Sequence, residues 1–141
     1  MGTEVAKTAL EALAQEKLDD AAALTADGRW SNAYYLAGYA VELALKACIA
    51  KAFKDNTIPD KDLVNAIYRH DFRSLVGTAG LSADLRAKEQ ADAAFAANWG
   101  VVNLWSPNSR YKNATQQEAE ELLRAIRDQD DGVFQWIRAF W

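Results

Sequence analysis

The stretch from Trp30 to Lys51 constrains the fold more than any other part of the chain. Apolar residues recur in it at intervals of three and four along two adjacent stripes, which is helical spacing and not the alternation of a strand. A helix that is apolar around most of its circumference is normally the central helix of a bundle, covered by other helices on several sides. One narrow polar stripe remains on this helix, formed by Tyr35, Tyr39, Glu42 and Lys46.

The two charges of this stripe need an explanation. Glu42 precedes Lys46 by four residues, the order in which such a pair interacts best along a helix. A charge in so apolar a helix must be paired or must face a cleft. The sequence therefore predicts that Glu42 pairs with a cation, and the helical spacing offers Lys46 as that cation. The pair then serves a binding site, or it is a buried ionic latch that fixes the helix register.

The rest of the chain predicts a single all-α domain over residues 1–141, with no strand-like alternation and no repeat. A first helix over residues 3–26 ends at Asp27-Gly28, and the short connection that follows makes it an antiparallel neighbour of the central helix. Gly38, inside the central helix, is expected to let another backbone come close. A polar connector, Lys54, Asp55, Asn56 and Pro59, follows the central helix.

Short helices are expected around residues 62–68 and from Asp71, which can cap its helix, to Val76. A third long helix is expected from Ser82, as its cap, to about Trp105. The last long helix opens with a Thr115–Glu118 capping box and has a core stripe that reaches Phe140. The predicted fold is thus an antiparallel up-and-down helical bundle of four long helices plus one or two short helices.

Composition excludes several function classes. The net charge is −4, and residues 118–131 hold six acids against two arginines, which leaves fourteen acids and fourteen bases elsewhere. A broad basic face for duplex DNA is therefore not expected, although a local basic surface is. The single cysteine, Cys48, and the single histidine, His70, predict no disulfide, no metal site and no cofactor, and they fit a reducing, cytoplasmic compartment. Charged residues interrupt the best candidate for a membrane span, and no signal peptide is recognisable.

Two polar patches lie where helices are expected to break. One is Tyr68-Arg69-His70-Asp71-Phe72-Arg73, and the other runs from Trp105 to Lys112 and contains Arg110-Tyr111. Both combine cationic donors with aromatic faces, as sites for phosphate and for single-stranded nucleic acid do. The alternative is structural: Asp71 caps a helix, the two arginines beside it pair with local acids, and Tyr111 closes the core.

A pattern that covers most of the chain resembles the HEPN domain family. It comprises Trp30, Ala33, Tyr34, Tyr35, Leu36, Gly38, Tyr39, Val41, Glu42, Leu43 and Lys46, then His70-Asp71-Phe72 and Leu75, then Trp105 and Arg110-Tyr111. The resemblance implies an antiparallel helical bundle that is usually dimeric and binds nucleotides. It also suggests that the polar stripe of the central helix faces a groove lined by His70 and Arg110-Tyr111, so Arg110 from across the bundle is the alternative partner of Glu42. Many members are metal-independent RNases of toxin–antitoxin or phage-defence systems, and their active site is an arginine separated from a histidine by four to six residues.

This sequence departs from that RNase motif. The positions that should carry the arginine before His70 are Leu63, Val64 and Asn65, and no histidine follows Arg110. The chemistry needs a group that exchanges a proton near neutral pH, and arginine cannot do so. The sequence therefore favours a protein that is not an enzyme, with activity left open.

Three hypotheses follow. The first is a non-catalytic module that binds an RNA segment or a nucleotide in the groove beside Glu42 and Lys46, with cationic and aromatic contacts from Arg69, His70, Arg73, Arg110, Tyr111, Trp105 and Tyr39. The second is a divergent metal-independent RNase with His70 as general acid or base and Arg110 or Arg69 stabilising charge on phosphorus. The third is a homodimer that engages a protein partner, which the resemblance suggests is a nucleotidyltransferase antitoxin.

Overall fold

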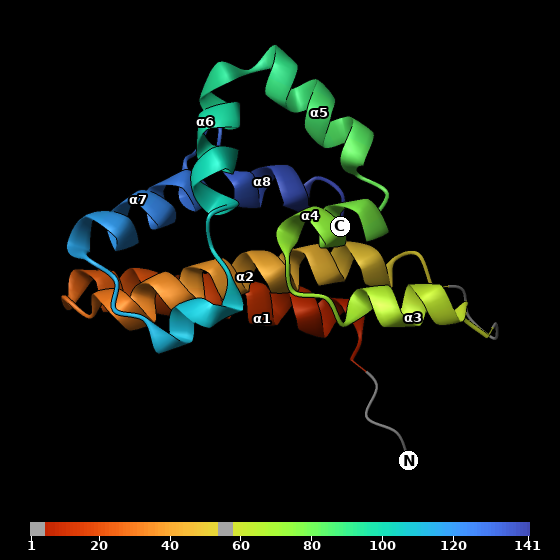
Figure 1. Cartoon of the computed structure of the whole chain (residues 1–141), viewed down its shortest axis with the longest axis horizontal. Coiled ribbons are helices and arrows are strands. Elements are labelled where there is room, and N and C mark those ends of the chain that lie inside the picture. The colour runs from red at the N-terminus through yellow and green to blue at the C-terminus, as the bar shows by residue number, and fades with distance from the viewer. Residues whose placement is uncertain (1–4, 54–57) are drawn as a thin grey trace.

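The computed structural model describes residues 5–53 and 58–141, and these form helices and connecting turns with no strand among them. Figure 1 shows the arrangement. The elements are α1 (Lys7–Ala26), α2 (Trp30–Ala50), α3 (Lys61–Ile67), α4 (Phe72–Thr78), α5 (Ser82–Ala91), α6 (Ala93–Val102), the 3₁₀ turn η1 (Pro107–Tyr111), α7 (Gln116–Arg127) and α8 (Val133–Arg138). The all-α fold class predicted from the sequence is confirmed.

The two longest helices, α1 and α2, form the predicted antiparallel hairpin and lie side by side (Figure 1). Twelve residues of α2 are buried, and α7, α4, η1 and α8 also pack on it, so α2 is the central helix that its composition predicts. The first helix begins at Lys7 and not at residue 3, and residues 1–4 lie outside the described part.

By length and composition, α2 is also apolar enough to cross a membrane, with a mean hydropathy of 1.2 over 18 residues. The sequence argument that its charges exclude a span is therefore too strict. However, 67% of that window is buried inside the fold, as in the core helix of a folded domain. The apolar character of α2 is thus accounted for by contacts within the chain.

The predicted third long helix is instead two helices, because the chain is extended at Asp92 (φ −141°, ψ 100°). The Asp92 carboxylate accepts the Phe95 N–H at 3.0 Å and so caps α6, and it also pairs with Lys88 at 3.1 Å. Ser82 does not cap α5, since the residue in the cap position is Leu81. Figure 1 shows α6 standing across α2 instead of running along it, unlike a simple up-and-down bundle.

The predicted last long helix is also broken, between Asp128 and Gly132. A Cβ at Gly132 would overlap the carbonyl oxygens of Asp128 and Ile126, so the tight turn there needs glycine. Of the four long helices that were predicted, α1 and α2 are therefore present in the described part of the chain, and each of the other two is divided into two helices. The missed signal is the run Asp128-Gln129-Asp130-Asp131-Gly132, which has no apolar residue to continue the core stripe.

The shorter features agree better with the sequence. Asp71 caps α4 by accepting the Ser74 N–H at 3.1 Å, and both bonds of the Thr115–Glu118 capping box are present. The two short helices occur where they were predicted, as α3 and α4. Of the predicted polar connector, Lys54, Asp55 and Asn56 lie outside the described residues.

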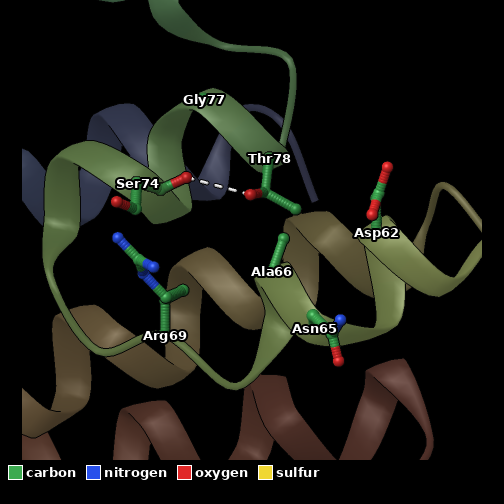
Figure 2. Close-up of a pocket in the computed structure, with 7 residues that line it drawn as sticks. All are labelled: Asp62, Asn65, Ala66, Arg69, Ser74, Gly77 and Thr78. Atoms are coloured by element: carbon green, nitrogen blue, oxygen red, sulfur yellow. Dashed lines mark hydrogen bonds between the residues drawn. The ribbon is translucent and has the colours of Figure 1, made fainter.

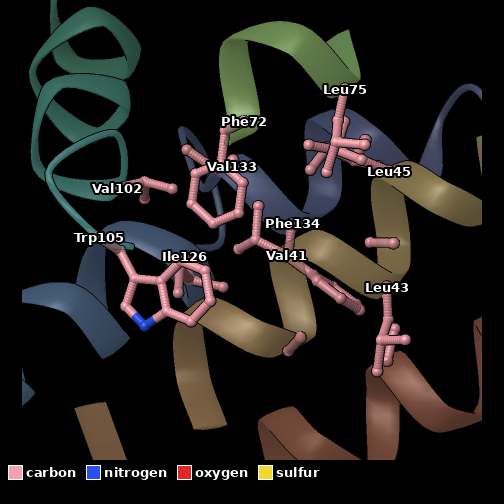
Figure 3. Close-up of a cluster of buried hydrophobic side chains, with 14 of the residues drawn as sticks. Val41, Leu43, Leu45, Phe72, Leu75, Val102, Trp105, Ile126, Val133 and Phe134 are labelled. Carbon is pink, nitrogen blue, oxygen red and sulfur yellow. The ribbon is translucent and has the colours of Figure 1, made fainter. Parts of the chain in front are cut away.

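Aliphatic and aromatic side chains from α2, α4, α6, α7 and α8 meet in one core (Figure 3). Phe72 at the start of α4 stacks on Trp105, with ring centroids 5.2 Å apart and planes 7° from parallel. Cys48 is 5% exposed, and burial raises the pKa of its thiol to about 11. The cysteine is therefore a core residue, as predicted, and a poor nucleophile near neutral pH.

Gly38 allows the closest packing in this core. The Trp105 indole lies directly on Gly38, where a Cβ would overlap three of its ring atoms. The sequence predicts a close approach at Gly38, and it is an indole and not a backbone that makes it. Because Trp105 precedes η1, this contact holds η1 against the middle of α2.

We expect Gly38→Ala to destabilise the fold by about 1–3 kcal/mol, because the added methyl overpacks the site against Trp105. The matched control is Gly100→Ala in α6, where a Cβ meets nothing within 4 Å and the gain in helix propensity should stabilise by about 0.5–1 kcal/mol. Urea unfolding followed by circular dichroism measures both. Equal stabilisation by the two substitutions would show that the Trp105–Gly38 contact is not tight.

Candidate functional site

A concave pocket of about 550 Å³ lies beside the middle of α2, between η1 and the segment that leads into α4. We call it the Glu42 pocket. It is lined by Tyr35, Tyr39, Glu42, Lys46, His70, Trp105, Pro107, Asn108 and Arg110. The polar stripe of α2 thus faces the residues at two helix breaks that are distant in the sequence.

Glu42 is the one buried charged side chain among the described residues, with 3% of its surface exposed. Its Oε2 lies 3.2 Å from Lys46 Nζ, so the cation predicted from the helical spacing is present. The carboxylate also faces His70, whose Nδ1 lies 3.3 Å from Oε1 and 3.2 Å from Oε2. Two groups that can carry positive charge therefore compensate the buried carboxylate. The sequence predicted Lys46 as a partner of Glu42 but did not predict His70 as one.

The contact with Glu42 orients the imidazole ring. A carboxylate only accepts hydrogen bonds, so Nδ1 must carry the hydrogen in this contact. The His70 side chain is 56% exposed, and Nε2 lies at the other end of the ring from the carboxylate. The ring is thus held by a buried anchor while much of its surface stays accessible to a ligand.

Arg110 lines the same pocket from η1 but forms no ion pair with Glu42 within the described part of the chain. Its guanidinium lies over the Tyr111 ring, 4.8 Å from the centroid. Interactions with Tyr111, and then with Tyr35, raise the pKa of Arg110 above its ordinary value. The predicted alternative in which Arg110 pairs with Glu42 is therefore wrong, and the guanidinium charge is not neutralised by the buried carboxylate.

Aromatic rings form one wall of the pocket. Tyr35 stacks on Tyr39 with centroids 6.0 Å apart, and Tyr35 is also 6.0 Å from Trp105. Burial raises the pKa of Tyr39, and repulsion from the Glu42 carboxylate adds to that effect, so its phenol keeps its proton as a donor. Trp105 is 5% exposed and stacked on Phe72, so the face that the sequence predicts it to offer a base is already covered.

Three of the predicted ligand residues lie outside the Glu42 pocket. Arg69 projects into the groove between α3 and α4 (Figure 2) and lies 3.7 Å from Asp71. Arg73 is exposed on α4, and Tyr111 is 75% exposed instead of closing the core. Neighbours in the sequence thus face different surfaces, with His70 in the pocket and Arg69 in the adjacent groove.

The pocket brings together Tyr39, Glu42, Lys46, His70, Trp105 and Arg110 from the predicted set. Pro107, Asn108 and Tyr35 also line it but were not predicted as ligand residues. Tyr35 belongs to the polar stripe of α2 and Asn108 to the second polar patch, so both signals were in the sequence. No group of three histidine, cysteine or carboxylate side chains suited to a metal occurs within residues 5–53 and 58–141.

Comparison with known proteins gives one match. The family model described as HEPN domain matches residues 12–128, which is most of the chain and includes every residue that lines the Glu42 pocket. No curated protein and no solved structure matches the chain.

We expect Lys46→Met to destabilise the fold by about 2 kcal/mol, because it leaves a carboxylate with 4% side-chain exposure without its ammonium partner. The control is Lys7→Met on α1. Lys7 pairs with Glu11 at the same i,i+4 spacing, at 2.8 Å, but the side chains are 31% and 25% exposed. That substitution should cost no more than about 1 kcal/mol. If thermal or urea unfolding gives equal losses, Glu42 is not a buried charge in solution.

Proposed function

This chain belongs to the HEPN domain family, and we propose that it binds the phosphate of an RNA segment or nucleotide in the Glu42 pocket without cleaving it. The observation that carries the proposal is the convergence of Lys46, His70 and Arg110 on one pocket beside stacked tyrosines. Lys46 lies on α2, His70 in the segment before α4, and Arg110 on η1. Cationic groups of this type donate strong hydrogen bonds to phosphate oxygens.

The charge balance of the pocket supports an anionic ligand. Glu42 supplies one negative charge, while Lys46 and Arg110 supply two positive charges before His70 is counted. Glu42 is turned into the protein and is contacted by Lys46 and His70, whereas Arg110 is exposed on η1. A phosphate that approaches from solvent therefore meets the guanidinium without first meeting the carboxylate.

The shape of the pocket supports a single-stranded or mononucleotide ligand. Its volume of about 550 Å³ is in the usual range for small-molecule sites. Tyr35 and Tyr39 are half-buried, so each keeps some ring surface exposed where a base can pack. A duplex keeps its bases stacked inside and offers no base to such a pocket, so we favour unpaired RNA.

We expect Arg110→Ala to weaken RNA binding about tenfold, because it removes a charge-assisted contact with phosphate. Fluorescence anisotropy of an end-labelled single-stranded RNA, titrated with protein at low and moderate salt, measures the affinity. The control is Arg86→Ala, which removes another exposed arginine, on α5, that does not line the pocket. Unchanged affinity in the Arg110 variant would place the site elsewhere, and a lack of salt dependence would argue against phosphate contacts.

A second function, a divergent metal-independent RNase, is favoured by the Glu42–His70 contact. Carboxylate–imidazole pairs orient a histidine so that its other nitrogen can exchange a proton with substrate. Here Glu42 contacts Nδ1, which leaves Nε2 for that exchange, and Arg110 lies in the same pocket to stabilise charge on phosphorus. Both functions use the same pocket and differ in whether the RNA is cut.

The two functions are separated by following the anisotropy over time in the presence of a chelator. A stable signal means binding alone, while a decay that His70→Ala abolishes, with circular dichroism unchanged, means cleavage by His70. We expect the stable signal, because the arginine–histidine spacing of the RNases is missing. A decay that persists in the His70→Ala variant would rule out His70 as the catalytic group.

A further inference from the structure

The contact between Glu42 and His70 decides which nitrogen of the neutral imidazole carries the hydrogen. His70 Nδ1 lies 3.3 Å from Glu42 Oε1 and 3.2 Å from Oε2, and a carboxylate only accepts hydrogen bonds. The hydrogen bond made by one ring nitrogen sets the tautomer of the whole ring. In neutral His70 the hydrogen is therefore on Nδ1, and Nε2 has a lone pair that can only accept.

This tautomer does not suit an anionic ligand. The oxygens of an RNA phosphodiester accept hydrogen bonds and donate none, so they are repelled by the lone pair on Nε2. When the ring takes up a second proton, both nitrogens become donors. Nδ1 then keeps its bond to Glu42, Nε2 can donate to a phosphate oxygen, and the imidazolium adds a positive charge to those of Lys46 and Arg110.

The burial of Glu42 disfavours the neutral tautomer that could donate to phosphate. If the hydrogen moved to Nε2, the lone pair of Nδ1 would face the carboxylate. Glu42 is 3% exposed, so solvent cannot readily replace the lost donor, and Lys46 alone would remain to compensate the charge. An unsatisfied buried charge is costly. Neutral His70 is therefore held in the form that repels phosphate, while most of the imidazole surface stays accessible to solvent.

The other groups that face His70 titrate far from neutral pH as residue types. Among the described residues that line the pocket, the titratable or charged ones are Tyr35, Tyr39, Glu42 and Lys46 from α2 and Arg110 from η1. On either side of His70 in the chain, Arg69 and Asp71 lie 3.7 Å from each other. Histidine is the residue type that changes charge between about pH 5 and 8. His70 is the chain's only histidine, so a pH effect in this range is assigned to it.

We propose that Glu42 is a positioning residue that couples RNA binding in the pocket to the uptake of one proton by His70. This inference rests on the proposed function, because it concerns how the same pocket accepts a phosphate. The proton comes from solvent and is added to Nε2, which then donates it in a hydrogen bond to the phosphate. No covalent bond of the RNA forms or breaks. Binding is consequently tighter at lower pH.

The tautomer is tested first, without a ligand. Because the chain has a single histidine, isotopically labelled full-length protein gives one set of ring signals. Nitrogen chemical shifts, recorded at rising pH until the ring is neutral, show which nitrogen keeps its hydrogen. We expect the hydrogen on Nδ1. A hydrogen on Nε2, or an average of the two tautomers, would overturn the proposal.

The proton uptake is tested by calorimetric titration with a short oligouridylate that has no terminal phosphate. The charge of this RNA does not change near neutral pH, so protons taken up on binding go to the protein. The titration is repeated at constant ionic strength in buffers that differ in their heat of ionisation. On the alkaline side we expect uptake to approach about one proton per RNA and affinity to fall up to about tenfold per pH unit.

The outcomes separate this inference from the proposed function. Binding that has the same affinity across the pH range, with no proton uptake, would overturn the inference and leave the proposed function standing. No binding at any pH would refute the proposed function and the inference with it.

Glu42→Gln tests the positioning role. Glutamine can accept from Nδ1 or donate to it, so both neutral tautomers become available and the negative charge is lost. We expect affinity at alkaline pH to rise about tenfold and proton uptake to fall. The control is Glu11→Gln on α1, which removes a carboxylate paired with Lys7 outside the pocket and should keep the uptake. Lower affinity of the Glu42 variant at every pH would show a structural role only.

His70→Gln tests the same coupling while the buried carboxylate stays in place. The glutamine amide can donate to Glu42 but does not titrate, so affinity should no longer depend on pH. Arg110→Ala should weaken binding but keep the proton uptake, because the ring and its anchor are intact. Proton uptake that persists in the His70 variant would assign the proton to another group and overturn the proposal.

Discussion

The packing of the Trp105 indole on Gly38 is the contact on which the Glu42 pocket depends. Trp105 follows α6 and precedes η1, so this contact fixes η1 on α2 at the middle of the central helix. On its other side the indole stacks on Phe72, at the start of α4, and the segment just before Phe72 carries His70. One side chain therefore sets the distance between the two walls of the Glu42 pocket, and it can do so only because position 38 has no Cβ.

The second constraint is electrostatic. A carboxylate that is 3% exposed in an apolar helix must be compensated, and Glu42 is compensated by Lys46 from the next turn and by His70 from a separate segment. Lys46 is local and would be present in an isolated helix, whereas His70 arrives only when α3 and α4 have docked. The charge arrangement of the pocket is therefore complete only in the folded domain. The residues that stabilise the fold are therefore the same ones that line the site for which we propose ligand binding.

Sequence reasoning predicted the central helix, the α1–α2 hairpin, the α4 cap and the capping box of α7, because each depends on neighbours in the chain. It missed the breaks at Asp92 and Asp128–Gly132, because apolar residues recur on both sides of each polar interruption. Within the site, it identified six pocket residues by type. It could not predict that His70 and Arg69, adjacent in the chain, face different surfaces, because that depends on how α3 and α4 dock. The predicted homodimer, nucleotidyltransferase partner, toxin–antitoxin role and cytoplasmic location stay predictions.

The place of η1 in the wall of the Glu42 pocket has a consequence for how this domain can diversify. A 3₁₀ turn has about three residues per turn, so inserting or deleting one residue rotates the later side chains of that turn by about 120°. Such a change in η1 would move Arg110 out of the Glu42 pocket and bring a neighbour into its place, while α2 and α7 stay unchanged. Length variation in five residues is therefore a route by which homologous domains can acquire different ligands without rebuilding their cores.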